Sequence, residues 1–178
     1  SNERYVANAQ LCAADLTHQR EHVLHGQAPW ATVISCADSR VPPELLFGGL
    51  GLGELFVCRN AGNVVDIDVL GTIEYGAAVL GSPLIVVMGH SSCGGVKGCH
   101  DMCTGHAPAL EEKTSFVGRW MDILRPGFER VAHLGKDEIL RALEQQAVLV
   151  SLENLMTFPF VAEAVKSGWI DLVSLGRP

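Results

Sequence analysis

The sequence lacks several features that mark particular classes of protein. It has no run of about 18 consecutive apolar residues, so a membrane-spanning helix is not expected. Its first residues, Ser-Asn-Glu-Arg, do not show the basic and then apolar order of a secretory signal. We therefore expect a soluble, cytoplasmic protein without a membrane partner, although a targeting segment that had been removed would leave no trace.

Basic residues are too few for binding to a polyanion. The chain has 13 Lys and Arg against 20 Asp and Glu, which gives a formal net charge of -7. Binding to a nucleic acid backbone needs a positively charged face. Nucleic acid is therefore not an expected partner.

Internal repeats, low-complexity tracts and linkers are also missing. With 178 residues, of which 48% are hydrophobic and 19% charged, the chain has the size and composition of one globular domain. We therefore treat residues 1–178 as a single domain. Its six cysteines are too sparse for a disulfide scaffold, so each has to be interpreted by its own surroundings.

Short apolar runs alternate with helical stripes along the chain. The expected strands cover 31–35, 56–58, 84–88 and 170–175, and the expected helices cover 5–24, 67–80, 116–124 and 139–150. Gly81, Pro126-Gly127 and Gly168 are expected to end helices, and Pro159 to begin one. The order predicts an α/β fold with a mainly parallel sheet of about four strands, flanked by helices, and with ligand chemistry at the carboxyl ends of the strands.

Two polar segments directly follow predicted strands. One is Cys36-Ala37-Asp38-Ser39-Arg40, and the other is His90-Ser91-Ser92-Cys93-Gly94-Gly95. Adjacent parallel strands would bring two thiols and one imidazole to the same edge of the sheet, which is the ligand set of a Cys2His zinc site. Three protein ligands leave the fourth tetrahedral position for water, whose pKa zinc lowers to about 7.

Asp38 and Arg40 follow Cys36 at alternate positions, so in an extended segment all three point to the same side. A carboxylate paired with a guanidinium stays ionised, and Asp38 would either orient the water-derived group, with Arg40 holding it, or coordinate zinc itself and close the site. Each residue alone also has an ordinary explanation as a buried thiol, a core histidine or a surface ion pair. Their coincidence at matching strand ends favours a site. Gly94-Gly95 is either an ordinary turn or a functional close approach of backbone to metal or substrate.

A second group of possible ligands is Cys99, His100, Cys103 and His106. Their spacing differs from the usual paired zinc-binding patterns, and we interpret them as exposed loop residues. His18, His22 and His25 recur at helical spacing, which is typical of a solvated helix face, and we assign them no function.

Three segments closely resemble the beta class of carbonic anhydrases. They are Cys36-Ala37-Asp38-Ser39-Arg40-Val41-Pro42-Pro43-Glu44, Phe56-Val57-Cys58-Arg59-Asn60-Ala61-Gly62-Asn63 and Gly89-His90-Ser91-Ser92-Cys93-Gly94-Gly95. The resemblance implies reversible hydration of carbon dioxide to bicarbonate. It also implies one Zn²⁺ per chain, held by Cys36, His90 and Cys93, an Asp38–Arg40 dyad, and a homodimer or a higher assembly of dimers in which the N-terminal helix packs on the partner subunit.

The resemblance also implies a substrate pocket and a subtype. Gln27, Phe56 and Tyr75 match the family's pocket residues, and Gly94 is placed with them. Family members that close the site by ligation of the aspartate usually have Trp where this chain has Val33, and Val-Ala in place of Ala61-Gly62, so the chain is expected to be of the open, plant-like type. It departs from the family pattern at Ser35, in a longer 41–56 segment, and in a C-terminal strand that looks truncated.

Two further functions fit the same ligands. One is hydrolysis of carbon disulfide or carbonyl sulfide, which are linear triatomic molecules like carbon dioxide, so that selectivity would lie in the access route. The other is a non-catalytic, zinc-stabilised interaction or redox module. In such a module the open fourth position and the Asp38–Arg40 pair would have no purpose.

Overall fold

A four-stranded parallel sheet forms the centre of the protein. The structure is a computed structural model that describes residues 16–48, 51–107 and 116–175. The strand order is β2-β1-β3-β4, and each neighbouring pair is parallel. The strands are β1 (Ala31–Cys36), β2 (Leu55–Asn60), β3 (Leu84–Met88) and β4 (Asp171–Leu175). This confirms the predicted α/β class and the predicted strands.

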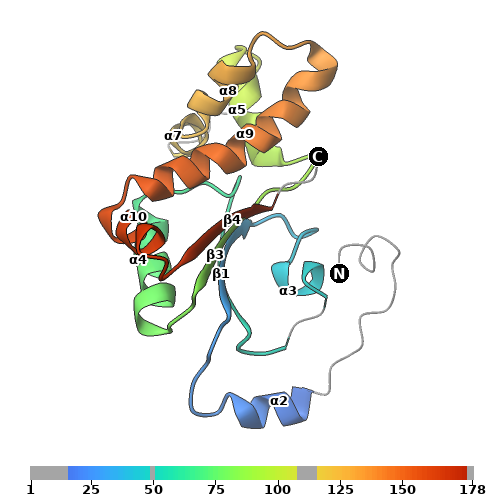
Figure 1. The fold of residues 1–178 in the computed structure, drawn as a ribbon. Coiled ribbons are helices and arrows are strands. Elements are labelled where there is room, and N and C mark those ends of the chain that lie inside the picture. The colour runs from blue at the N-terminus through green and yellow to red at the C-terminus, as the bar shows by residue number, and fades with distance from the viewer. Residues whose placement is uncertain (1–15, 49–50, 108–115, 176–178) are drawn as a thin grey trace.

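Helices cover the sheet unevenly. They are α2 (Leu16–His22), α3 (Pro43–Leu46), α4 (Ile67–Glu74), the π-helical turn η1 (Tyr75–Val79), α5 (Gly94–Cys103), α7 (Val117–Asp122), α8 (Arg125–Val131), α9 (Lys136–Met156) and α10 (Pro159–Lys166). Figure 1 shows α4 and α10 on one side of the sheet and α3 on the other, while α5, α7 and α8 gather with α9 beyond one end of the strands. Helix α2 lies at the opposite end.

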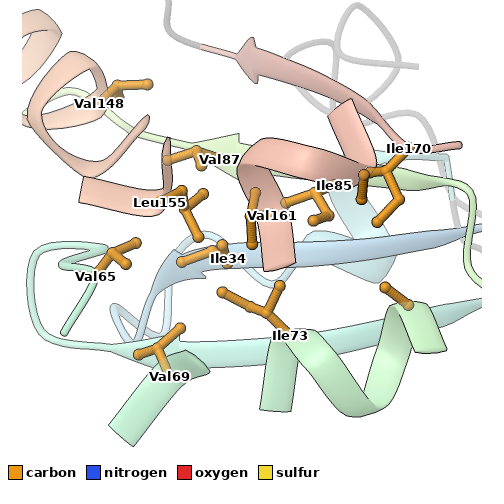
Figure 2. Close-up of a cluster of buried hydrophobic side chains, with 12 residues drawn as sticks. Ile34, Val65, Val69, Ile73, Ile85, Val87, Val148, Leu155, Val161 and Ile170 are labelled. Carbon is orange, nitrogen blue, oxygen red and sulfur yellow. The ribbon is translucent and has the colours of Figure 1, made fainter. Parts of the chain in front are cut away.

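Side chains alternate between the two faces of the sheet, as the pleat of a strand requires. Ile34, Ile85 and Val87 point into the largest cluster, where they meet residues of α4, α9 and α10 (Figure 2). Val33 and Val86 point to the other face, toward α3. A third cluster contains Cys36 and Cys93 together with buried residues of α5, α8 and α9. The carboxyl end of the sheet therefore packs against a cluster of buried apolar side chains.

Glycine and proline mark helix ends as predicted, with one exception. Gly81 and Gly168 have φ values of 71° and 72°, in the left-handed region that favours glycine after a helix, and Pro159 lies in the first turn of α10. Pro126, however, does not end a helix: α7 already ends at Asp122, and Pro126 lies in the first turn of α8. Proline lacks only an N–H that the first turn leaves unbonded, so it starts α8, a helix that the sequence pattern did not reveal.

The interpretation of Cys99, His100 and Cys103 as exposed loop residues is wrong. They lie in α5, with Cys99 only 1% exposed and His100 and Cys103 half-buried, while His106 lies beyond the helix. The cysteines act as small apolar residues and take the inward positions of the helix, and the weak helix formers Gly94 and Gly95 hid its start. Burial raises the pKa of Cys99 to about 12, so this thiol stays protonated.

Helix α9 is the longest element and belongs largely to the core, where Leu143, Ala147 and Leu155 are fully buried. In the described part of the chain, no single helix has the length and apolar character needed to cross a membrane. Only α9 and α10 taken together, with a bend of 93° between them, meet that test, and they do so by length and composition alone.

Two leucines of α9 test the importance of the apolar cluster that contains Cys36 and Cys93. Leu143 is 0% exposed and Leu149 is 42% exposed. Leu143→Ala should lower the free energy of unfolding by about 2–5 kcal/mol, because it removes buried methyl groups and leaves a cavity. Leu149→Ala, on the same helix, should cost no more than about 1 kcal/mol. Urea unfolding of both variants measures the difference, and equal losses would contradict the assigned packing.

Candidate metal centre

Two parallel strands bring three ligand atoms together. Cys36 ends β1, His90 follows β3, and Cys93 is the N-cap of α5. Because β1 and β3 are hydrogen-bonded neighbours, with Ser35 paired to Met88, the segments that leave them emerge side by side. The Sγ atoms of Cys36 and Cys93 are 3.8 Å apart, and the ligand atoms of all three residues lie within 4.8 Å of one another. Within residues 16–48, 51–107 and 116–175, these are the one group of His, Cys, Asp and Glu with such spacing.

The geometry fits zinc. Zn–S bonds of about 2.3 Å in a tetrahedral site place two sulfurs about 3.8 Å apart, which matches the observed separation. The Nδ1 atom of His90 lies 2.9 Å from the carbonyl oxygen of Ser91, so the neutral ring donates there and presents the lone pair of Nε2. That Nε2 atom is buried and has no hydrogen-bond partner among the described residues, as expected of a metal ligand.

The pKa values of the two cysteines are shifted in opposite directions. A hydrogen bond from Cys93 lowers the pKa of Cys36 to about 3, with a further contribution from His90, although burial acts in the opposite direction. The same hydrogen bond raises the pKa of Cys93, and burial adds to this. The interaction with the nearby Cys36 sulfur, whose negative charge favours a protonated ring, also raises the pKa of His90. The lowered pKa of Cys36 favours its thiolate, whose negative charge a divalent cation would neutralise.

Asp38 and Arg40 form a tight pair beside the ligands. The backbone N–H and Nε of Arg40 each donate to Oδ1 of Asp38 at 2.9 Å, and its Nη2 donates to Oδ2 at 2.5 Å. These bonds hold the pKa of the Asp38 carboxyl well below its usual range. Oδ2 also lies 4.0 Å from Nε2 of His90. An ionised carboxylate therefore stands next to the ligand atoms, in a fixed orientation.

Arg40 also joins the two ligand-bearing segments. Its Nη2 atom donates to the carbonyl oxygen of Ser92 at 3.1 Å, one residue before Cys93. Ser92 has a φ of 56°, an uncommon conformation for a residue other than glycine. The guanidinium group thus links the segment after β1 to the loop after β3.

Sequence reasoning missed two groups that hold the ligands by their backbone. Nε and Nη2 of Arg59 donate to the carbonyl oxygens of Cys36 and Asp38, at 3.0 and 2.6 Å. Oε1 of Glu144, on α9, accepts from the backbone N–H of Cys93 at 3.2 Å. Register gives the signal for Arg59, which is paired with Ser35 next to the first ligand. No sequence signal singles out Glu144, because it comes from a distant helix.

The predicted pocket residues Gln27, Phe56 and Tyr75 do not lie near the ligands of their own chain. Phe56 is paired with Thr32, four residues before Cys36, which corresponds to about 13 Å along the sheet. The ring of Tyr75 lies 5.9 Å from that of Phe56. Gln27 lines a surface hollow of about 460 Å³, formed by the segments that lead into β1 and β2. All three are therefore at the amino end of the sheet, whereas the ligands are at the carboxyl end.

Gly94 is at the ligand end, in the first turn of α5. A Cβ atom built on Gly94 would meet no heavy atom within 4 Å, so its surroundings are open. At the next residue, Gly95, the backbone of Ala61 and Gly62 lies close.

Comparison with known proteins agrees with this centre. The family model described as "Carbonic anhydrase" matches residues 31–176. The chain belongs to the carbonic anhydrase family. Within this family it has the fold of the beta class, since it matches one of the "two tetrameric beta-carbonic anhydrases" from Sordaria macrospora with a TM-score of 0.76 and 27% identity, over 97% of this chain and 89% of that one.

Curated carbonic anhydrases match over different lengths. The chain is 50% identical over 95 residues to carbonic anhydrase 2 of Mycobacterium tuberculosis, which covers 53% of this chain and 45% of that protein. It is 39% identical over 180 residues to the carbonic anhydrase of Pseudomonas aeruginosa, which covers 96% of this chain and 74% of that protein. The match thus spans less than half of the mycobacterial relative.

Arg59 can be tested by metal affinity. Arg59→Met removes the donors to the carbonyl oxygens of Cys36 and Asp38, and it should weaken zinc binding by about 10–100-fold, as is usual when groups that orient metal ligands are lost. Arg141→Met changes an exposed arginine of α9 and should leave the affinity unchanged. Competition with a chromophoric chelator measures both constants. An unchanged dissociation constant for Arg59→Met would show that the hydrogen bonds of Arg59 do not position the ligands.

Proposed function

We propose that this protein catalyses the reversible hydration of carbon dioxide to bicarbonate and a proton. The observation that carries the proposal is the meeting of a Cys2His ligand set with an ionised carboxylate, with Oδ2 of Asp38 4.0 Å from Nε2 of His90. Cys36, His90 and Cys93 would hold a zinc ion, which would lower the pKa of a bound water to about 7 and so make it available for attack on the carbon atom. A purely structural site would have no use for the carboxylate.

The residues of the chain orient the reactants. Oδ2 of Asp38 accepts a hydrogen bond from the attacking water and thereby directs its lone pair toward carbon dioxide. Because Arg40 keeps Asp38 ionised and fixed, this acceptor stays available and needs no reorganisation. Gly94 leaves room for substrate at the start of α5, because a side chain built there would meet no heavy atom within 4 Å of its Cβ.

We further propose the open, plant-like form of the site. Arg40 donates three hydrogen bonds to the Asp38 carboxylate, two to Oδ1 and one to Oδ2, and these hold the carboxylate in its present orientation. The arginine is in turn held by the carbonyl oxygen of Ser92. These contacts favour an aspartate that orients the substrate over one that closes the site.

The decisive variant is Asp38→Ala. Loss of the orienting acceptor should lower the rate of carbon dioxide hydration by about 10²–10⁴-fold, while the zinc content stays near one per chain. Asp122→Ala is the matched control, since Asp122 also pairs with an arginine, Arg125, but on the surface of α7. Stopped-flow hydration and metal analysis on the same samples give both values.

Full hydration activity in Asp38→Ala would remove the carboxylate from the mechanism. Wild-type protein that hydrolyses carbon disulfide or carbonyl sulfide but fails to hydrate carbon dioxide would select the first alternative. Loss of folding in Cys93→Ala, with no activity in the wild type on any of these substrates, would select the zinc-stabilised module.

We also propose that the active form is a homodimer or a higher assembly of dimers, in which Gln27, Phe56 and Tyr75 serve the metal site of the partner. Their distance from the ligands of their own chain is the main support. Tyr75 itself is 49% exposed, and so are other large apolar side chains at this end of the sheet, among them Trp30 (40%) and Leu52 (43%). The Sordaria macrospora relatives are described as tetrameric. Helix α2 lies apart from the sheet (Figure 1). In the proposed arrangement it packs on the partner subunit.

Mixing two inactive variants tests the shared pocket. Cys93→Ala lacks a metal ligand but keeps Gln27, whereas Gln27→Ala keeps the ligands. If Gln27 acts on the partner, a mixed dimer contains one complete site, and denaturing and refolding the two variants together should restore up to about a quarter of the wild-type rate per chain. Each variant refolded alone is the control. No gain on mixing, in dimers shown to be mixed by mass spectrometry, would place Gln27 in its own chain's site or in none.

A further inference from the structure

A backbone amide points at one of the two ligand sulfurs. The N–H of Gly62 donates to Sγ of Cys36, with nitrogen and sulfur 3.4 Å apart. Gly62 follows β2 and has a φ of 82°, a backbone angle that residues other than glycine rarely adopt. The amide therefore reaches the sulfur from a backbone conformation that depends on glycine.

The segment that carries this amide is fixed from three directions. The side chain of Asn60 bonds both the N–H and the carbonyl oxygen of Val64, at 2.9 and 2.7 Å. Nε1 of Trp120, on α7, donates to the carbonyl oxygen of Ala61 at 2.8 Å, and Oγ of Ser151, on α9, donates to that of Asn63 at 2.8 Å. These contacts set the direction of the Gly62 N–H before any metal binds.

Gly95 packs directly on this amide. A Cβ atom at Gly95 would lie 2.9 Å from N and 3.0 Å from Cα of Gly62, and 3.3 Å from the carbonyl carbon of Ala61. The neighbouring atoms are all backbone, so they cannot move aside as the end of a flexible side chain does. Gly94 and Gly98 differ from it: a Cβ atom at Gly94 meets nothing within 4 Å, and one at Gly98 makes ordinary contact with Met121 at 3.5 Å.

We propose that the Gly62 amide tunes the Cys36 sulfur as a metal ligand, and that Gly95 is the positioning residue that seats it. Two thiolates donate more electron density to zinc than imidazoles would, which weakens zinc as an acid. A hydrogen bond to sulfur draws part of that density back, as hydrogen bonds to ligands do at other metal sites. The inference rests on the metal site of the proposed function and does not depend on the identity of the substrate.

Cadmium NMR on the wild-type protein tests the hydrogen bond itself. With ¹¹³Cd bound in place of zinc, the Gly62 amide proton should show a scalar coupling to the metal, transmitted through the N–H···S bond. Observation of that coupling supports the proposal. Its absence, with ¹¹³Cd bound to the cysteines, would overturn the proposal, and this result needs no variant that might alter folding.

Cobalt spectra test the role of Gly95. In Gly95→Ala the displaced Gly62 amide should leave the sulfur, and the sulfur-to-cobalt charge-transfer band should move to longer wavelength, because the sulfur electrons rise in energy. In Gly98→Ala, which adds the same methyl group to the same helix, the band should stay in place. A folded, cobalt-loaded Gly95→Ala protein with the wild-type band would overturn the role of Gly95.

The same samples separate this inference from the proposed function. A wild-type protein that bound neither cobalt nor cadmium at Cys36 and Cys93 would overturn both. A wild-type protein that showed the ¹¹³Cd coupling and the band shift but did not hydrate carbon dioxide would uphold the inference and overturn only the proposed activity.

Discussion

Parallel pairing of β1 with β3 is the constraint on which the site depends. The two strands are neighbours at the centre of the sheet, and their matched register makes Cys36 and the loop that contains His90 and Cys93 leave the sheet together. No single short segment contains all three ligands, since the two sulfurs are separated by 57 residues in the sequence. Any change that shifts this register would separate the sulfurs and the imidazole, even if each loop kept its own conformation.

Around the ligands, side chains act mainly on backbone groups. Arg59 holds two carbonyl oxygens of the first segment, Glu144 holds the N–H of Cys93, and Arg40 connects the segments through Ser92. Charged groups bound to backbone dipoles make stronger hydrogen bonds than neutral pairs, and they restrict where the ligands can move. The positions of the three metal-ligating side chains are thus determined together by residues from β2, from α9 and from the segment that follows β1.

The sequence allowed the strands, the ligand set and the Asp38–Arg40 pair to be predicted, because each is encoded in a short run of residues. Leu84–Met88 shows its burial by continuous apolar character, and the ligands directly follow predicted strands. Helices α5 and α8 were missed because glycine, cysteine and proline conceal their starts. Contacts between distant elements, such as that of Glu144 with Cys93, have no local pattern, and the position of Gln27 relative to the ligands depends on register and on assembly.

The distance in sequence between Cys36 and Cys93 also has a thermodynamic meaning. A metal ion bound to both sulfurs cross-links the chain in the way a disulfide would, and closes a loop of 57 residues. The loop-entropy estimate used for disulfides puts such a cross-link at about 4 kcal/mol of stability, gained by restricting the unfolded chain. The metal would therefore act as a staple between the two halves of the sheet, and resistance to unfolding would follow the supply of free metal as well as the packing of the core.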